Sequence, residues 1–192
     1  MSQAMRAGMT ADDFFRWHVL QERRYELVDG EPVMMAGANQ RRAQIVTNSI
    51  LAIASRLGSS DCRPFTSDTA VLIPAGNIRY PDLTVDCGRL VDDSMHATEP
   101  RVVVEVLSPT TATFDQTERL EEYRTVPTLI QVLVVNPDAM EARLHSRTDT
   151  GWISAPLRGE AASVDLSSVD VSFPLGELYR GLSFRPRPAL VG

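Results

Sequence analysis

Two stretches decide the fold of this chain: RYPDLTVD at residues 79–86 and RVVVEVLSP at residues 101–109. Both are rich in β-branched residues, which favours buried β-strands. Each nevertheless carries a carboxylate, Asp82 in the first and Glu105 in the second. Carboxylates are rarely buried unless they are paired or bind a metal, and two on neighbouring strands repel each other unless a cation or a shared proton lies between them. We therefore expect a divalent-metal site built from Asp82 and Glu105, with Asp86 on the same strand face as a rim or supporting residue.

Length, composition and charge narrow the class of protein. The 192 residues suit one domain with a sizeable core, and the hydrophobic content of 43% and charged content of 23% are ordinary for a globular protein. A net charge of −6 gives no overall attraction to nucleic acid or to an anionic membrane, so a nucleic-acid-binding function would require a local basic face. No apolar run is long enough to span a bilayer, and residues 1–13 lack the apolar core of a signal peptide. We expect a cytoplasmic protein without membrane association.

The two cysteines and three histidines show no metal-ligand spacing. Cys62 and Cys87 are expected to remain thiols in a reducing compartment and to pack as small apolar side chains. His18, His96 and His145 are scattered, which is typical of surface or structural histidines.

Periodicity and turn signals predict the order of elements. They are a helix at 10–20, a hairpin at 25–35 around Asp29-Gly30, a helix at 41–57, strands at 62–65, 69–73, 81–87 and 102–107, a helix at 114–125, a strand at 129–135, a hairpin at 141–155 and a helical turn at 175–179. This order predicts an α/β or α+β fold, with a central mixed sheet flanked by helices and preceded by an N-terminal helix and β-hairpin. We expect residues 10–184 to form one domain, with a disordered tail at 1–9 and a flexible tail at 185–192.

Five ordered blocks resemble a known family. They are YELVDGE at 25–31, YPDL at 80–83, VEVLSPTT at 104–111, FDQTERLEEYR at 114–124 and VPTLIQVLV at 126–134. Together they look like the Uma-two family, restriction-type endonucleases of the PD-(D/E)xK superfamily, and the resemblance spans roughly residues 10 to 182. It implies a restriction-endonuclease-like core with an acidic metal site at a sheet edge.

The resemblance also implies roles for individual residues. Asp82 matches the acid of the Pro-Asp motif, Glu105 the second acid and Glu26 the N-terminal acid. Asp82 and Glu105, with the Val106 carbonyl, would hold Mg²⁺ or Mn²⁺ through hard oxygen ligands, and the metal would activate water and polarise a phosphate. Glu26 would orient water or complete a second metal site. Arg119 would take the place of the family lysine, with its guanidinium pointing toward the Asp82–Glu105 pair.

Three positions depart from the family pattern. The family lysine usually lies on the helix after the Glu105 strand, where this chain has Arg119, and Leu107 occupies the E-x-K position. Arg42 stands where histidine is frequent and Gln131 where glutamate is frequent. Arginine can stabilise developing negative charge but cannot readily act as a base. Three functions therefore stay open: a metal-dependent DNA endonuclease acting as a homodimer, a non-catalytic nucleic-acid-binding or regulatory module on the same fold, and a small-molecule phosphoesterase.

Structural roles compete with these functional ones. Asp82 follows a proline and could cap a turn, and Glu26 could pair with an arginine. Arg119 could form a solvated salt bridge to Glu122 or Asp115 on its own helix. The Arg41-Arg42 pair could touch phosphate or form a solvated helix start, where positive charge opposes the helix dipole.

Overall fold

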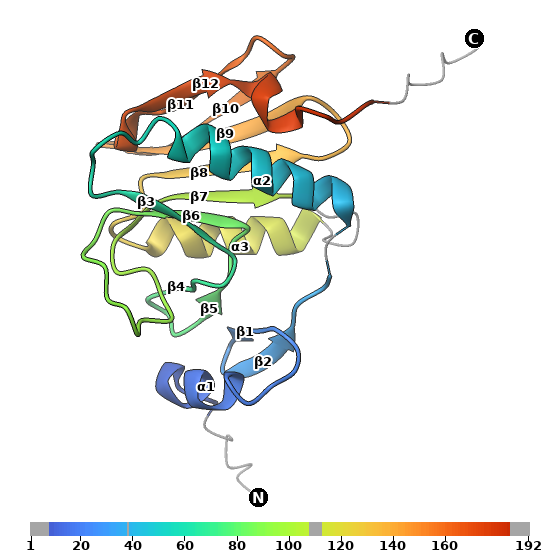
Figure 1. The fold of residues 1–192 in the computed structure, drawn as a ribbon. Coiled ribbons are helices and arrows are strands. Elements are labelled where there is room, and N and C mark those ends of the chain that lie inside the picture. The colour runs from blue at the N-terminus through green and yellow to red at the C-terminus, as the bar shows by residue number, and fades with distance from the viewer. Residues whose placement is uncertain (1–7, 38, 108–112, 185–192) are drawn as a thin grey trace, which may run out of the picture.

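A six-stranded mixed sheet forms the centre of the computed structural model, which describes residues 8–37, 39–107 and 113–184 and, for 113–116, the backbone alone (Figure 1). Its strands are β3 (Arg63–Thr66), β6 (Leu83–Asp86), β7 (Pro100–Val106), β8 (Gln131–Asn136), β9 (Glu141–Thr148) and β10 (Gly151–Arg158). Their order is β10-β9-β8-β7-β6-β3, in which β7 and β8 are parallel and every other neighbouring pair is antiparallel. The two predicted acidic strands, β6 and β7, therefore lie side by side.

Each face of this sheet is covered by different elements. On one face lie α2 (Gln40–Ala54), the hairpin of β11 (Ser163–Leu166) and β12 (Val171–Pro174), and the short helices η1 (Ser167–Val169) and η2 (Leu175–Tyr179); α3 (Thr113–Thr125) covers the other (Figure 1). Along β7, Val102, Val104 and Val106 pack on the α2 side, whereas Val103 packs on the α3 side. Since strand side chains alternate, Glu105 belongs to the α3 face.

A smaller N-terminal module packs beside the α3 face (Figure 1). It consists of α1 (Ala11–His18), β1 (Tyr25–Val28), β2 (Glu31–Met34), β4 (Val71–Leu72) and β5 (Ile78–Arg79), whose strands form a sheet in the order β2-β1-β5-β4. Asp29 and Gly30 both have positive φ, 50° and 78°, as a two-residue hairpin turn of this hand requires. A Cβ on Gly30 would lie 2.6 Å from the Gly8 Cα, so this turn also needs glycine for close packing.

The predicted fold class is confirmed, with local differences. Thr10 caps the first helix as expected, accepting a hydrogen bond from the Asp13 amide, although the helix ends at His18. The prediction missed β5 and the β11–β12 hairpin. The predicted strand end at Ser108-Pro109 and the predicted tails at 1–7 and 185–192 fall outside the described residues. Met9, which the prediction placed in the disordered N-terminal tail, is described, and its amide donates a hydrogen bond to the Gly30 carbonyl. No helix in the described ranges is long and apolar enough to cross a membrane.

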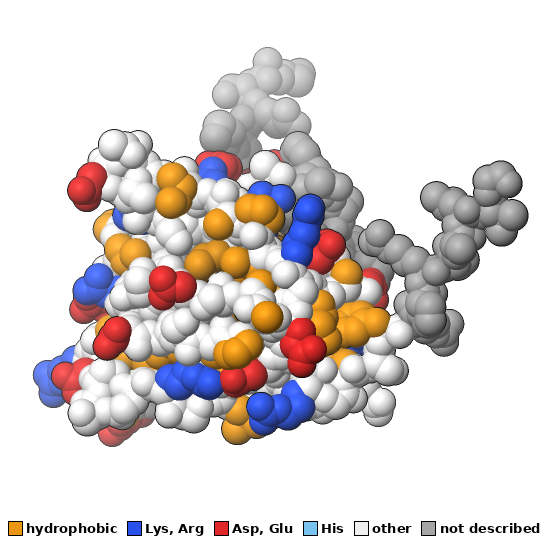
Figure 2. Space-filling view, turned by 90° about the horizontal axis from the view of Figure 1, so that it is seen from above, with side chains coloured by type: hydrophobic (Ala, Val, Ile, Leu, Met, Phe, Trp, Pro, Cys, Tyr) orange, Lys and Arg blue, Asp and Glu red, His pale blue; other side chains and the backbone are white. Residues whose placement is uncertain are grey.

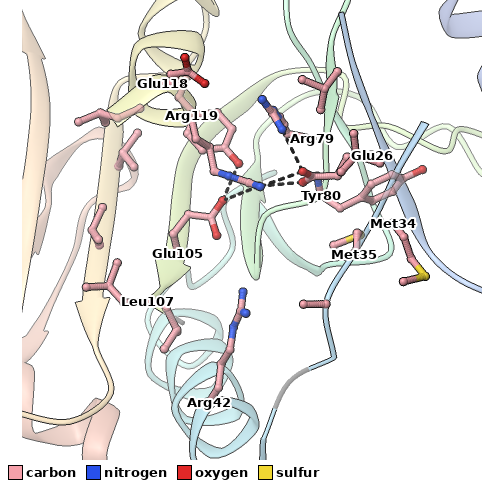
Figure 3. Close-up of a pocket in the computed structure, with 18 residues that line it drawn as sticks. Glu26, Met34, Met35, Arg42, Arg79, Tyr80, Glu105, Leu107, Glu118 and Arg119 are labelled. Carbon is pink, nitrogen blue, oxygen red and sulfur yellow. Dashed lines mark hydrogen bonds and ion pairs between the residues drawn. The ribbon is translucent and has the colours of Figure 1, made fainter. Parts of the chain in front are cut away.

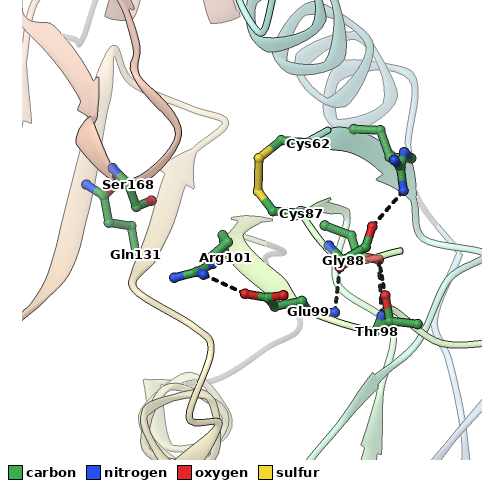
Figure 4. Close-up of a disulfide and its surroundings, with 10 residues drawn as sticks. Cys62, Cys87, Gly88, Thr98, Glu99, Arg101, Gln131 and Ser168 are labelled. Atoms are coloured by element: carbon green, nitrogen blue, oxygen red, sulfur yellow. Dashed lines mark hydrogen bonds and ion pairs between the residues drawn. A yellow bond between two sulfur atoms is a disulfide. The ribbon is translucent and has the colours of Figure 1, made fainter. Parts of the chain in front are cut away.

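The expectation that the cysteines stay thiols is wrong: Cys62 and Cys87 form a disulfide with an S–S distance of 1.97 Å (Figure 4). The cause is strand register, because β3 and β6 pair Arg63 with Asp86. Cys62, which precedes Arg63, therefore lies opposite Cys87, which follows Asp86. Their Cα atoms are 3.9 Å apart. The bond closes a loop that contains β3, β4, β5 and β6.

Asp86 does not join the predicted acidic site. The β6–β7 register shifts between Val85 and Asp86, at the far end of β6 from Asp82. There the Asp86 carboxylate accepts hydrogen bonds from the amides of Gly88, Thr98 and Glu99, at 3.2, 3.1 and 2.6 Å. Asp86 is therefore a structural residue that orders the loop between β6 and β7, and the expected rim role is wrong.

Candidate functional site

A cavity of about 480 Å³ lies between the N-terminal module and the α3 face of the central sheet (Figure 3). Its charged lining includes Glu26 from β1, Glu105 from β7, Arg119 from α3 and Arg42 from the first turn of α2. The remaining walls are largely apolar side chains of β2, β7, β8 and α3. Segments far apart in the sequence therefore bring four of the predicted site residues, Glu26, Glu105, Val106 and Arg119, to one cavity, whereas Asp82 is not among the residues that line it.

Asp82 lies at the entrance to β6, opposite Glu105. The register pairs Leu83 with Val104, so the next pair along the two strands is Asp82 and Glu105. The Val106 amide donates to Asp82 Oδ2 at 2.8 Å, which fixes the carboxylate against β7. The Arg42 guanidinium closes the other side, with Nε 3.1 Å from Oδ2 and Nη2 2.9 Å from both carboxylate oxygens.

Glu26 is the most heavily paired acid of the site. Arg119 binds it with two parallel contacts, Nη1 to Oε1 at 2.7 Å and Nη2 to Oε2 at 2.8 Å, and Arg79 Nη1 contacts Oε2 at 3.0 Å. The Tyr80 amide also donates to Oε1 at 3.0 Å. Burial raises the pKa of Glu26, but Arg119, the Tyr80 amide and Arg79 outweigh it and hold the pKa below its usual value. Glu26 is therefore an anion.

The pKa of Glu105 is shifted in the opposite direction to that of Glu26. The Tyr123 hydroxyl donates to its Oε1 at 2.6 Å, and Arg119 Nη1 is 3.5 Å from the same atom. Burial, together with the negative charges of Asp82 and Glu26, raises the pKa of Glu105 to about 7, although Arg119 and the Tyr123 hydrogen bond pull it down. Glu105 therefore exchanges its proton near neutral pH.

A charge count explains this difference. Four carboxylates form the network, and Glu122 joins it by contacting Arg79 Nε at 2.5 Å. They are Glu26, Asp82, Glu105 and Glu122, and they face three arginines, Arg42, Arg79 and Arg119. Each of the other three acids has an arginine within 3.0 Å, so Glu105 is the acid whose charge remains uncompensated.

The predicted orientation of Arg119 is met only in part. Figure 3 shows its guanidinium between Glu26 and Glu105, and its short contacts are to Glu26. Sequence reasoning did not assign Tyr123 or Arg79 to the site. Tyr123 lies four residues after Arg119, on the same helix face, and that spacing could have identified it. Arg79 precedes the Pro-Asp motif, but its partner Glu26 is 53 positions away, and no local pattern indicates it.

Gln131, the third departure from the family pattern, lies away from the cavity. It is 2% exposed, and its side chain donates to the Asp165 carbonyl at 2.9 Å and accepts from the Ser168 amide at 3.0 Å (Figure 4). These contacts attach the β11 end and η1 to the central sheet, so Gln131 has a structural role in this chain.

A second cavity of about 320 Å³ adjoins the first. The two share Leu107, Leu120 and Val134, and the second is bordered by Arg143 and Arg158. They form one groove along the α3 side of the sheet. The carboxylate–arginine network lies at one end, and Arg143, Arg158 and Glu141 lie at the other, where Arg158 Nε is 3.9 Å from Glu141 Oε1. The face that carries β11 and β12 differs, because basic and acidic side chains are interspersed over its described part (Figure 2).

The donor set fits a hard divalent cation in part. Asp82, Glu105 and the Val106 carbonyl offer oxygen ligands, and Mg²⁺ commonly takes one or two carboxylates and keeps several waters. The uncompensated Glu105 is the acid to which a cation would bring missing charge. Within the described residues, however, no group of three or more histidine, cysteine or acidic side chains converges in a manner that could hold a metal. The described residues therefore supply a site of two carboxylates, Asp82 and Glu105, and Arg42 engages Asp82.

Comparison with known proteins agrees with this architecture. The model of the Uma2 family, described as "Putative restriction endonuclease", matches residues 11–176. Two proteins of Synechocystis sp., both described as uncharacterized, are similar: one is 28% identical over 180 residues, covering 92% of this chain and 94% of the relative, and the other 26% identical over 168 residues, covering 85% and 95%.

A solved structure shares the fold. It is the crystal structure of "a putative nuclease belonging to DUF820" from Anabaena variabilis, with a TM-score of 0.71 and 16% sequence identity, covering 88% of this chain and 97% of that one. At this identity the likeness concerns the arrangement of helices and strands.

Proposed function

The chain belongs to the Uma2 family, and on this premise we propose that it is a Mg²⁺- or Mn²⁺-dependent endonuclease that hydrolyses phosphodiester bonds of DNA. The observation that carries the proposal is the fourth carboxylate of the network, Glu105, which lies opposite Asp82 across β6 and β7. Its nearest arginine, Arg119, is 3.5 Å away and makes its shorter contacts to Glu26. A structural ion-pair network has no need of such a group, because an uncompensated buried charge is costly.

The residues of the site would divide the work. Asp82, Glu105 and the Val106 carbonyl would hold the cation, which supplies an activated water and polarises the phosphate. Arg119, held by Glu26, would place a fixed positive charge beside the reacting phosphate and stabilise charge that develops there. Tyr123 would orient the Glu105 carboxylate, and Arg79 would keep Glu26 in place. The adjoining groove, with Arg143 and Arg158 at its far end, suits the continuing backbone of a nucleic acid.

Plasmid cleavage tests the proposal. Purified protein should nick supercoiled DNA with Mn²⁺ and lose this activity with chelator. Asp82→Asn and Glu105→Gln should abolish nicking. Glu177→Gln is the matched control, because Glu177 is a carboxylate paired with Arg56 at 2.7 Å outside this network, and it should cleave like the wild type. Cleavage that survives chelator or the Glu105→Gln change would contradict the proposal.

One observation favours a second candidate, a non-catalytic nucleic-acid-binding module. Arg119 gives its two short contacts to Glu26, and both oxygens of Asp82 are held by Arg42, so the site is largely neutralised from within. Such a module would retain DNA in a gel-shift assay with Mg²⁺ and leave it intact. If Arg119→Lys then produced cleavage, the natural chain would be a degenerate nuclease.

The proposal extends to assembly and location. Cleavage of both strands of a duplex needs two sites related by a two-fold axis, and one chain supplies one, so we infer a homodimer. We place this homodimer in the cytoplasm, as expected from the sequence. Sedimentation at micromolar concentration tests the dimer, and a monomer with double-strand cleavage would contradict it.

A further inference from the structure

The Arg42–Asp82 pair occupies the atoms that a metal would need. Arg42 contacts both carboxylate oxygens of Asp82 at 2.9–3.1 Å, and the Val106 amide takes a further position on Oδ2. A two-point guanidinium–carboxylate contact is among the stronger ion pairs in proteins. A cation reaching Asp82 must therefore compete with a positive charge that is already there.

Arg42 differs from the other arginines of the network in how it is held. Arg79 is almost fully buried, with 6% of its side chain exposed, and joins Glu26 to Glu122. Arg119 joins Glu26 to Glu105. Among the acids of the described residues, Arg42 contacts Asp82 alone. It keeps 22% of its side chain exposed and lines the cavity, so it can leave without breaking a second ion pair of this network.

The position of Arg42 on its helix also favours exchange. It lies in the first turn of α2, where its amide is capped by the Asn39 side chain at 2.9 Å. A cation in the first turn opposes the helix dipole, and the first turn of α2 contains no acidic residue to offset this. The pairing with Asp82 is thus the main electrostatic gain of Arg42 in its present position.

We propose that Arg42 is a built-in counter-cation of Asp82, which a divalent metal must displace before it can bind to the Asp82–Glu105 pair. This inference rests on the metal site of the proposed function and adds its regulation. The resting protein then holds metal weakly, and removing the Arg42 charge strengthens binding without adding a ligand. Asp82 keeps the Val106 hydrogen bond in such a variant, so its carboxylate stays in position.

Calorimetric titration with Mn²⁺ alone, at pH 8 and without DNA, tests the proposal. Arg42→Gln should bind Mn²⁺ roughly tenfold or more tightly than the wild type, as expected for removal of a bidentate charged contact. Arg42→Lys retains a cation but loses the two-point geometry, so its affinity should fall between the two. It also serves as the test if Arg42→Gln does not fold in thermal melts.

Arg56→Gln is the matched control. Arg56 follows the C-terminal end of the same helix and pairs with Glu177 through both Nη atoms. Among the described residues it does not contact the cavity acids. Arg56→Gln changes the net charge by the same amount as Arg42→Gln. Because exposed charges are screened, the Mn²⁺ affinity of Arg56→Gln should stay within about twofold of that of the wild type. An equal gain in both variants would reduce the effect to net charge and overturn the proposal.

The remaining outcomes separate this proposal from the nuclease function. Equal Mn²⁺ affinity in the wild type and Arg42→Gln, with metal-dependent nicking intact, overturns the role of Arg42 and leaves the nuclease in place. Tighter binding in Arg42→Gln without cleavage by any variant supports the role of Arg42 and removes the nuclease. Absence of Mn²⁺ binding in every variant overturns both.

Discussion

The Glu105→Gln substitution should stabilise the metal-free protein at alkaline pH. Glutamine keeps the size of the side chain and an oxygen that can accept the Tyr123 hydrogen bond, and it removes the fourth negative charge of the network. Arg119 retains its two contacts to Glu26. The substitution thus isolates the cost of ionising Glu105 from the packing of its side chain.

The magnitude follows from the pKa of Glu105, which rises from an ordinary value of 4.5 to about 7 in the folded chain. A raised carboxyl pKa means that the folded state holds the proton more tightly than the unfolded state. The contribution of Glu105 to wild-type stability is therefore highest below pH 4.5, falls between pH 4.5 and 7, and stays low above pH 7. At about 1.4 kcal/mol per pKa unit, the loss is on the order of 3 kcal/mol.

Urea denaturation in the presence of chelator, at pH 5 and pH 8, measures this effect. The free energy of unfolding of Glu105→Gln should exceed that of the wild type at pH 8 by an amount on the order of 3 kcal/mol, and the gain should shrink toward zero at pH 5. Glu122→Gln is the control, because Glu122 pairs with Arg79 and its loss should destabilise at both values. A Glu105→Gln protein that is less stable than the wild type at pH 8 would refute the reasoning.

Three further predictions use the same urea denaturation assay. Tyr123→Phe removes the hydrogen bond that favours ionised Glu105, so the pH range over which stability falls should move upward; an unchanged range would contradict the assigned bond. Replacing Cys62 and Cys87 by serine should cost roughly 3–4 kcal/mol of stability, from the closure of a loop with a sequence separation of 25, and reductant should affect the wild type but not the variant. Gln131→Leu removes the hydrogen bonds to two partly buried backbone groups and should cost about 1–3 kcal/mol while leaving plasmid nicking intact.

The strands and helices were largely predictable because their signals are local. Burial of β7 on both faces of the sheet follows from its valines, and the capping by Thr10 and the Asp29-Gly30 turn appear where the residue types require them. The β11–β12 hairpin was missed although Val164, Leu166, Val171 and Phe173 alternate with polar residues. Strands of four residues give too short a pattern to distinguish from a loop.

The acidic residues of the candidate site could be predicted from the sequence, but the arginines that pair with them were harder to predict. Asp82 and Glu105 stand out because carboxylates interrupt apolar strands. Which arginine reaches which acid depends on tertiary packing, since Arg119 meets Glu26 across 93 positions and Arg42 meets Asp82 across 40. Sequence spacing carries no information on such pairs.

The disulfide was missed for a related reason. Cys62 and Cys87 flank two strands, and their contact depends on the register of β3 against β6, which the sequence does not specify locally. The expected compartment also argued for thiols. The structure therefore adds a covalent link around the segment that carries Arg79 and Asp82.

A crystal of the protein grown with Mn²⁺ at pH 8 tests the central claim most directly. The account predicts an anomalous difference peak between the carboxylates of Asp82 and Glu105, with oxygen–metal distances of about 2.0–2.6 Å and the Arg42 guanidinium moved away from Asp82. The same crystals of Glu105→Gln should show no such peak. A wild-type map without a peak at this pair, or with Mn²⁺ bound elsewhere, would contradict the assignment of Asp82 and Glu105 as the metal site.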